Sequence, residues 1–288
     1  MLFLRVFPTR SLALLTMACA SLAAHAAPAA GAALQNVSPD STARSVVGAL
    51  PAAYARWQSS MDAFAAADQQ HLPQSGGVLF VGSSTIRMWT DLREDFRQVP
   101  VVINRGFGGS TMADCNYFVK SLVVQYRPRH VMVYAGDNDL AEGRTPAQVL
   151  ESFQSFVAAV RTALPQTRIS YISIKPSPLR AGLVPQAREA NALLADYVRT
   201  LPQSDYIDVF TPMMQADGTP RTDLFGPDRL HMNDAGYDLW RSVISAYVDA
   251  PAGGGTAVQA GVAAPAGLPA PVAVPAAAGG IVRVSAER

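Results

Sequence analysis

The segment Gly77-Val-Leu-Phe-Val-Gly-Ser-Ser-Thr-Ile-Arg-Met-Trp89 decides how the rest of the chain is interpreted. It begins as a short apolar run, which is typical of a buried strand, and stops at a glycine followed by two serines. Apolar residues then return at Ile86, Trp89 and Leu92, the spacing of one helix face. A strand that turns directly into a helix holds a serine hydroxyl beside the unpaired N–H groups of the helix N-terminus. The segment therefore predicts either a simple polar turn or a site for a nucleophile and an oxyanion.

Four further strand candidates follow, with helical patterns before, between and after them. The strand candidates span 100–104, 130–134, 168–174 and 206–210, and helical patterns lie at 57–65, 112–123, 145–160, 185–198 and 237–247. Alternation of this kind predicts an α/β fold, a three-layer α/β/α sandwich around a five-stranded parallel sheet. Ligands of such sheets bind beyond the carboxyl ends of the strands, where the polar turns after strands one, two, three and five converge.

The composition and the two ends of the chain limit its location and partners. The 288 residues carry a net charge of +1 without a basic block, so nucleic acid is not an expected partner. Residues 1–26 have the basic start, apolar run and small-residue ending of a secretory signal peptide, and no segment is long enough to be a transmembrane span. We expect a linker at 27–52, a single folded domain at 53–249 and a disordered Ala/Gly/Pro/Val-rich tail at 250–288.

Export to the periplasm or the extracellular space is the expected localisation. Lipid anchoring through Cys19 is the less favoured alternative, because Thr16 is a poor residue three positions before a lipidated cysteine. The second cysteine, Cys115, falls on an apolar helix face and is expected to pack as a small hydrophobic residue.

A serine nucleophile needs a base, and histidine is the side chain best suited to remove its proton near neutral pH. Of the four histidines, His25 falls in the signal peptide, His71 precedes the first strand and His130 opens the third strand at the wrong end of the sheet. His231 lies in the loop after the fifth strand, at the edge where the polar turns meet. Sequence position therefore selects His231 as the base for Ser84.

Other residues at the same edge could complete an acyl-transfer site. Asp228 precedes His231 by three positions and could accept a hydrogen bond from the second imidazole nitrogen. The N–H of Ser84, the N–H of Gly109 in a glycine-rich turn and the side-chain amide of Asn138 could bind an oxyanion. Each residue also has a purely structural explanation, because glycine, asparagine and aspartate all serve turns.

Four blocks of the chain together resemble, in order, those of the SGNH (GDSL-type) hydrolases. They are Gly82-Ser-Ser84, Asn104-x-Gly-x-Gly-Gly109, Gly136-Asp-Asn-Asp139 and Asp228-x-x-His231, and the resemblance spans about 53–249. It implies a flavodoxin-like sandwich in a secreted bacterial serine esterase that uses no metal or other cofactor. It also implies a Ser84–His231–Asp228 triad and an oxyanion hole formed by Ser84, Gly109 and Asn138. Ser83 stands where family members usually carry aspartate, which puts in doubt any bracing of the neighbouring loops by that residue.

The expected function is hydrolysis of short-chain acyl esters, above all acetyl esters, on carbohydrate or cell-envelope material. The substrate class rests on the family resemblance and on the absence of a long apolar lid segment. Two alternatives stay open at this point. Asp137, Asp139, Asp228 and His231 could bind a metal for phosphoester hydrolysis, although one histidine makes a thin ligand set. The same edge could also serve a non-catalytic carbohydrate-binding module.

Overall fold

A computed structural model describes residues 51–248, which hold nearly all of the domain expected at 53–249. The expected signal peptide at 1–26 and tail at 250–288 lie outside the described residues, as does all of the 27–52 linker except its last two positions.

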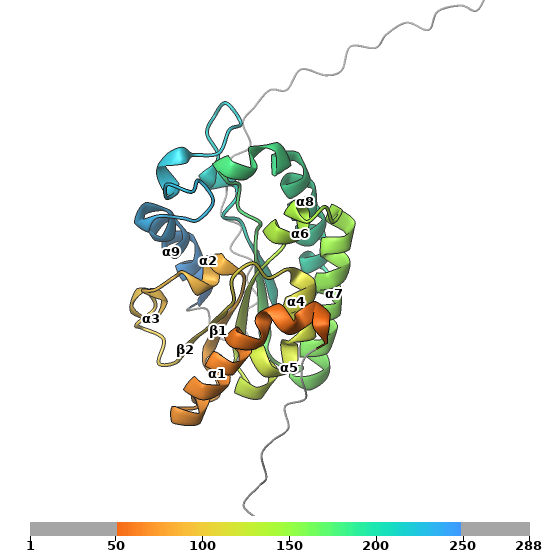
Figure 1. The fold of residues 1–288 in the computed structure, drawn as a ribbon, viewed down its shortest axis with the longest axis vertical. Coiled ribbons are helices and arrows are strands. Elements are labelled where there is room, and N and C mark those ends of the chain that lie inside the picture. Colours follow the sequence, from red (N-terminus) through yellow and green to blue (C-terminus); the bar gives the residue numbers. More distant parts are fainter. Residues whose placement is uncertain (1–50, 249–288) are drawn as a thin grey trace, which may run out of the picture. The chain divides into compact units, whose positions relative to one another are not determined.

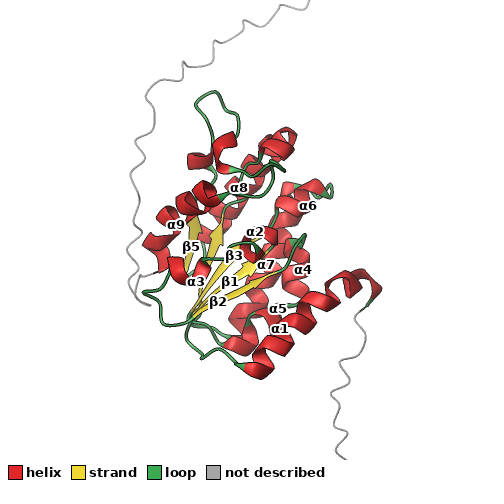
Figure 2. Ribbon diagram, turned by 60° about the vertical axis from the view of Figure 1, so that its left-hand side comes forward, coloured by secondary structure: helices red, strands yellow, loops and turns green. Residues whose placement is uncertain are grey.

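Five parallel strands form one sheet in the order β2-β1-β3-β4-β5 (Figures 1 and 2). The strands are β1 (Val78–Gly82), β2 (Val102–Gly106), β3 (His130–Tyr134), β4 (Arg168–Ile172) and β5 (Ser204–Ile207). This order is that of flavodoxin-like folds, whose strand order reverses between β1 and β3. The predicted five-stranded parallel sheet is therefore confirmed, and the reversal marks the place on its carboxyl edge where ligands bind in such folds.

Helices cover both faces of the sheet, which gives the predicted three layers (Figure 1). Along β1, Leu79 and Val81 enter one apolar core, whereas Val78 and Phe80 enter the other, as the alternation of side chains along a strand requires. The first core is closed by α1 (Gln58–Gln70), α4 (Met112–Tyr117), α5 (Val119–Leu122), α7 (Pro146–Ala163) and α8 (Val184–Arg199), and the second by α2 (Ser84–Arg87), α3 (Leu92–Asp95) and α9 (Asp234–Val248).

Short elements complete the described chain. They are α6 (Asp137–Ala141) and the 3-10 helices η1 (Ala52–Trp57), η2 (Val124–Tyr126), η3 (Pro178–Leu183), η4 (Thr211–Met213) and η5 (Thr222–Leu224). The start of α7 is as predicted: Thr145 and Gln148 form a capping box around Pro146. Between residues 51 and 248 no helix has the length and apolar character that crossing a bilayer requires.

Several predicted elements have different bounds in the structure. The second strand, β2, runs over Val102–Gly106 and not 100–104, and the fourth, β4, ends at Ile172 and not at 174. The fifth strand runs over Ser204–Ile207 and not 206–210, because the N–H groups of Val209 and Phe210 both donate to Ser173 Oγ, each at 2.9 Å, and leave the ladder. The helix expected at 112–123 is divided into α4 and α5 at Phe118, whose φ of −90° and ψ of 10° are not helical. The expected packing of Cys115 is confirmed, since its side chain is buried in the first core.

Candidate active site

Ser84 lies at the carboxyl end of β1, where the sheet order reverses. The strand ends at Gly82, and the N–H of Ser83 donates to the carbonyl oxygen of Tyr134 on β3 at 3.1 Å. Ser84 then begins α2 and is partly exposed, whereas Ser83 is 3 % exposed. The abrupt change from strand to helix therefore leaves Ser84 partly exposed at the sheet edge, and its N–H is one of the first N–H groups of α2, which have no partner within a helix.

The loop before α9 holds His231 and Asp228 in a fixed mutual geometry. Asp228 Oδ2 lies 2.6 Å from His231 Nδ1, and Asp228 Oδ1 accepts from the N–H groups of Leu230 at 3.0 Å and His231 at 2.9 Å. These hydrogen bonds to Leu230 and His231 lower the pKa of Asp228 to about 2. A bond from the Gly226 N–H to the His231 carbonyl, at 2.8 Å, closes the loop at its base.

The imidazole of His231 connects Asp228 to Ser84. Its Nε2 lies 2.9 Å from Ser84 Oγ, although 147 residues separate the two along the chain. A carboxylate only accepts hydrogen bonds, so Nδ1 carries the imidazole proton and Nε2 accepts from the serine hydroxyl. The side chains of His231 and Asp228 are 24 % and 52 % exposed, which places this hydrogen-bonded chain at the surface.

Gly109 and Asn138 approach the same edge from β2 and β3. Gly109 is exposed and has φ of +76°, a left-handed conformation that favours glycine. Asn138 belongs to α6, and its side-chain Nδ2 donates to the carbonyl oxygen of Ser110 at 3.0 Å. The turn after β2 and the turn after β3 are therefore tied together at the positions of both candidate oxyanion donors.

Asp139 has a bracing role that sequence reasoning missed. Its two carboxylate oxygens lie 3.1 and 2.9 Å from the N–H of Met112, the first residue of α4, and burial raises its pKa to about 6. Thr111 and Asp114 form a capping box at the same helix end. Asp139 therefore anchors the end of the glycine-rich turn and has no direct bond to the Ser84–His231 pair.

The carboxylates of the metal alternative do not come together. Asp137 pairs with Lys175 at 3.3 Å and Arg180 at 2.8 Å, Asp139 binds a backbone N–H, and only Asp228 contacts His231. Within residues 51–248, no three His, Cys, Asp or Glu side chains are grouped as a metal ion would require.

Residues 75–239 match the GDSL-like lipase/acylhydrolase family. The matched residues make up more than half of the chain. The fold and this match define a metal-independent carboxylic ester hydrolase. The chain belongs to the GDSL-like lipase/acylhydrolase family. No curated protein sequence matches the chain.

Solved structures share the fold at low sequence identity. A Streptococcus pneumonia protein provisionally described as a platelet activating factor has a TM-score of 0.60 at 18% identity, covering 66% of this chain and 91% of that one. A GDSL-like lipase from Bacteroides thetaiotaomicron has a TM-score of 0.57 at 17% identity, covering 65% and 96%. A catalytic mutant of an acetylxylan esterase from Geobacillus stearothermophilus has a TM-score of 0.52 at 14% identity, covering 62% and 96%.

Proposed function

We propose that this protein is a serine esterase that removes short acyl groups, with Ser84 as nucleophile, His231 as general base and Asp228 as the acid that orients His231. One observation carries the proposal: a continuous hydrogen-bonded chain runs from Asp228 through His231 to Ser84 at the point where the strand order reverses. A serine hydroxyl in this arrangement loses its proton as it attacks, which a free serine near neutral pH does not do.

The reaction proceeds in two acyl transfers. Ser84 Oγ attacks the ester carbonyl carbon while its proton passes to His231 Nε2, and the carbonyl oxygen becomes an oxyanion. The N–H groups of Ser84 and Gly109 and the Asn138 amide donate to that oxygen. The carbon–oxygen bond to the alcohol then breaks, and the alcohol leaves with the proton from His231. Water, deprotonated by His231, attacks the acyl-enzyme in the same way and releases the carboxylic acid and free Ser84.

The open position of the site supports a small acyl group. The Asp228 side chain is 52 % exposed and Gly109 is exposed, so the hydrogen-bonded chain lies near solvent. A long acyl chain gains affinity only where a deep apolar channel removes it from water. The solved acetylxylan esterase with the same fold makes acetylated carbohydrate, including cell-envelope polymers, the first substrate class to test.

The domain organisation and localisation are further parts of the proposal. Residues 1–26 act as a signal peptide, 27–52 as a linker and 250–288 as a tail beyond the catalytic domain, and the enzyme works in the periplasm or outside the cell. N-terminal sequencing of the protein recovered from the periplasm or culture medium tests this directly. A mature chain that begins at Ala27 supports it, whereas an intact Met1 in the cytoplasm contradicts it.

Hydrolysis of p-nitrophenyl esters of graded acyl length tests the reaction. The full chain is expected to cleave the acetyl ester fastest, and Ser84→Ala should lower kcat by on the order of 10³-fold or more. Ser83→Ala is the matched control, because Ser83 adjoins Ser84 but has no place in the hydrogen-bonded chain. Equal rates for Ser84→Ala and the wild type would exclude Ser84 as nucleophile. Carbohydrate binding without turnover by the wild type would favour the binding-module alternative.

A further inference from the structure

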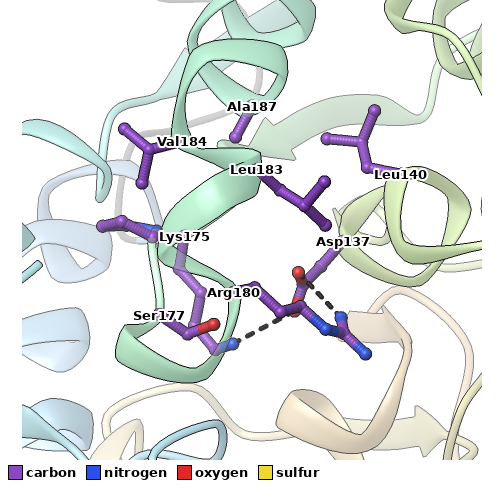
Figure 3. A pocket seen from close by; sticks show the side chains of 9 residues that line it. Asp137, Leu140, Lys175, Ser177, Arg180, Leu183, Val184 and Ala187 are labelled. Atoms are coloured by element: carbon purple, nitrogen blue, oxygen red, sulfur yellow. Dashed lines mark hydrogen bonds and ion pairs between the residues drawn. The ribbon is translucent and has the colours of Figure 1, made fainter. Parts of the chain in front are cut away.

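A cluster of charged side chains lies directly behind Asn138. It consists of Asp137 from α6, Lys175 from the segment after β4 and Arg180 from η3, and these residues line a small pocket (Figure 3). Asp137 Oδ2 lies 3.3 Å from Lys175 Nζ, and Asp137 Oδ1 lies 2.8 Å from Arg180 Nη1. The three side chains are 13 %, 1 % and 20 % exposed, so the ion pairs are largely removed from water.

The guanidinium of Arg180 contacts two neighbouring residues at once. While Nη1 pairs with Asp137, Nη2 donates to Asn138 Oδ1 at 3.1 Å. A guanidinium is planar and rigid, so the ion pair of Nη1 with Asp137 restricts where Nη2 of the same group can lie. Asp137, which is itself paired with Lys175, therefore holds Arg180 where it reaches the Asn138 side chain.

This contact decides which way the Asn138 amide faces. Arg180 only donates hydrogen bonds, so the atom it meets must be the amide oxygen, and Nδ2 must lie on the opposite side. One Nδ2 hydrogen goes to the carbonyl of Ser110 at 3.0 Å. Among the hydrogen bonds of residues 51–248, no protein acceptor takes the other hydrogen, which stays available to a ligand.

The cluster also contributes charge at this position. Burial opposes ionisation of Asp137, but Lys175 and Arg180 together hold the pKa of its carboxyl below the ordinary value. With Asp137 ionised, two cations face one carboxylate, and the cluster carries a net positive charge beside Asn138. Electrostatic attraction of this kind is stronger in a partly buried site than in water.

We propose that Arg180 is a positioning residue of the esterase reaction: it turns the free N–H of Asn138 toward the oxyanion of the tetrahedral intermediate, and Asp137, paired with Lys175, holds Arg180 in place. This proposal rests on the function proposed above. Lys175 lies 38 positions from Asp137 and Arg180 lies 42 positions from Asn138. Neither Lys175 nor Arg180 belongs to a sequence motif described above.

A double-mutant cycle with p-nitrophenyl acetate tests the proposal. Arg180→Met should lower kcat about 10- to 100-fold and change KM less than about threefold, because the lost interaction acts on the transition state. Arg180→Lys keeps the charge without the fixed fork and should recover only part of kcat. In an Asn138→Ala background, Arg180→Met should lower kcat by less than about twofold, since its target is gone. Arg188→Met is the control: Arg188 packs over Phe210 and forms no hydrogen bond with Asn138, so its loss should leave kcat unchanged.

Each other outcome has a definite meaning. An unchanged kcat for Arg180→Met, or an equal loss with and without Asn138, overturns the positioning role. If Asn138→Ala is fully active while Ser84→Ala is inactive, the positioning role also falls but the esterase stands. Turnover by Ser84→Ala would instead overturn the proposed function. Should Arg180→Met fail to fold, Asp137→Asn/Lys175→Met/Arg180→Met removes all three charges without leaving a buried ion unpaired and is measured in the same cycle.

Discussion

A Cβ atom built on Gly82 would lie 1.8 Å from the carbonyl oxygen of Tyr134. The two residues are register partners at the ends of β1 and β3, and Gly82 has φ of +150°. The same carbonyl accepts the N–H of Ser83 at 3.1 Å. The ends of β1 and β3 therefore lie so close together, where the strand order reverses, that only glycine fits at position 82. Gly82 is the last residue of β1, and Ser83 and Ser84 follow it directly.

This contact predicts a large stability loss for Gly82→Ala. The added methyl group meets backbone and not a flexible side chain, so the ends of β1 and β3 must separate, at a cost of about 3 kcal/mol or more. Urea denaturation measures the free energy of unfolding. Gly143→Ala is the matched control: Gly143 has φ of +86° but no atom within 4 Å of the added Cβ, so only backbone strain of about 1 kcal/mol applies. Equal losses for the two variants would contradict a steric role for the Gly82 contact.

Asp228→Asn is expected to lower kcat strongly with little change in KM. Asparagine can still accept from the N–H groups of Leu230 and His231, but its amide nitrogen would then face His231 Nδ1. That arrangement favours the imidazole tautomer with the proton on Nε2, which cannot accept the proton of Ser84. The expected loss is on the order of 10³- to 10⁴-fold in kcat, by analogy with the same substitution in serine protease triads.

Two further measurements define the role of Asp228. Because hydrogen bonds lower its pKa to about 2, its carboxylate stays ionised above about pH 4, and any acid limb in kcat/KM above that pH must belong to another group. Asp223→Asn is the control, since Asp223 is an exposed carboxylate nearby in the sequence that pairs with Arg221. Activity of Asp228→Asn equal to that of Asp223→Asn would remove Asp228 from the triad.

His130 predicts a specific loss of stability in acid. It begins β3 with 1 % exposure, and its Nε2 lies 2.7 Å from Ser170 Oγ. Burial, helped by the charges of Arg168 and Arg129 and opposed by Asp205, lowers its pKa from 6.5 to about 3. As the pH falls, His130 of the unfolded chain therefore becomes protonated near pH 6.5, whereas His130 of the folded chain stays neutral down to about pH 3. Above pH 6.5 this residue does not lower the free energy of unfolding. Between pH 6.5 and about pH 3 that free energy decreases as the pH falls, because only the unfolded chain binds the proton.

The matching experiment compares the pH dependence of unfolding in wild type and His130→Gln. Between pH 7 and pH 4 the wild type should lose about 3 kcal/mol more than the variant, a figure good to its order of magnitude. Parallel curves would contradict a buried, neutral His130. Activity at pH 7 should survive in any variant that folds, because the start of β3 lies at the end of the sheet opposite Ser84.

The parts of the fold that could be predicted are those written in local patterns. The run from Gly77 to Trp89 specifies a strand, a turn and a helix within a few residues, and the capping box at Thr145 fixes one helix start. The pairing of Ser84 with His231 also followed from topology, because each lies at the carboxyl edge, whereas His71 precedes β1 and His130 begins β3. The end of β5 could not be predicted, because it depends on Ser173, the residue after β4. The Ser173 hydroxyl accepts the N–H groups of Val209 and Phe210, which therefore form no hydrogen bonds within the sheet.

Long-range polar contacts limited the prediction of the site. Asp137 and Asp139 looked alike in the sequence, two carboxylates on either side of Asn138. In the structure Asp137 meets Lys175 and Arg180, whereas Asp139 faces the N-terminus of α4. Their directions depend on how α6 turns away from β3 at Gly136. Charge and spacing alone carry no such information, so the positioning cluster became visible only in three dimensions.

Gly109→Ala tests the second oxyanion donor. Alanine disfavours the φ of +76° at this position, and its Cβ would lie 3.3 Å from Cη2 of Trp57, a buried ring that packs edge-on against Phe107. The turn should therefore shift, moving both the Gly109 N–H and the Ser110 carbonyl that holds Asn138. We expect kcat for p-nitrophenyl acetate to fall about 10- to 100-fold with a smaller change in KM, because the proposed role of both donors is to stabilise the transition state.

Gly108→Ala is the control for the same turn. Its Cβ would approach only the side chain of Arg87, 3.0 Å from Nε, and Arg87 is exposed and can move away. We expect this variant to retain kcat within about threefold, since no backbone donor changes direction. If Gly109→Ala turns over as fast as Gly108→Ala while its melting temperature falls, the turn strains the fold without serving the oxyanion. In that case the oxyanion hole consists of Ser84 and Asn138 alone. Asn138→Ala should then lower kcat by more than it would if Asn138 were one of three donors.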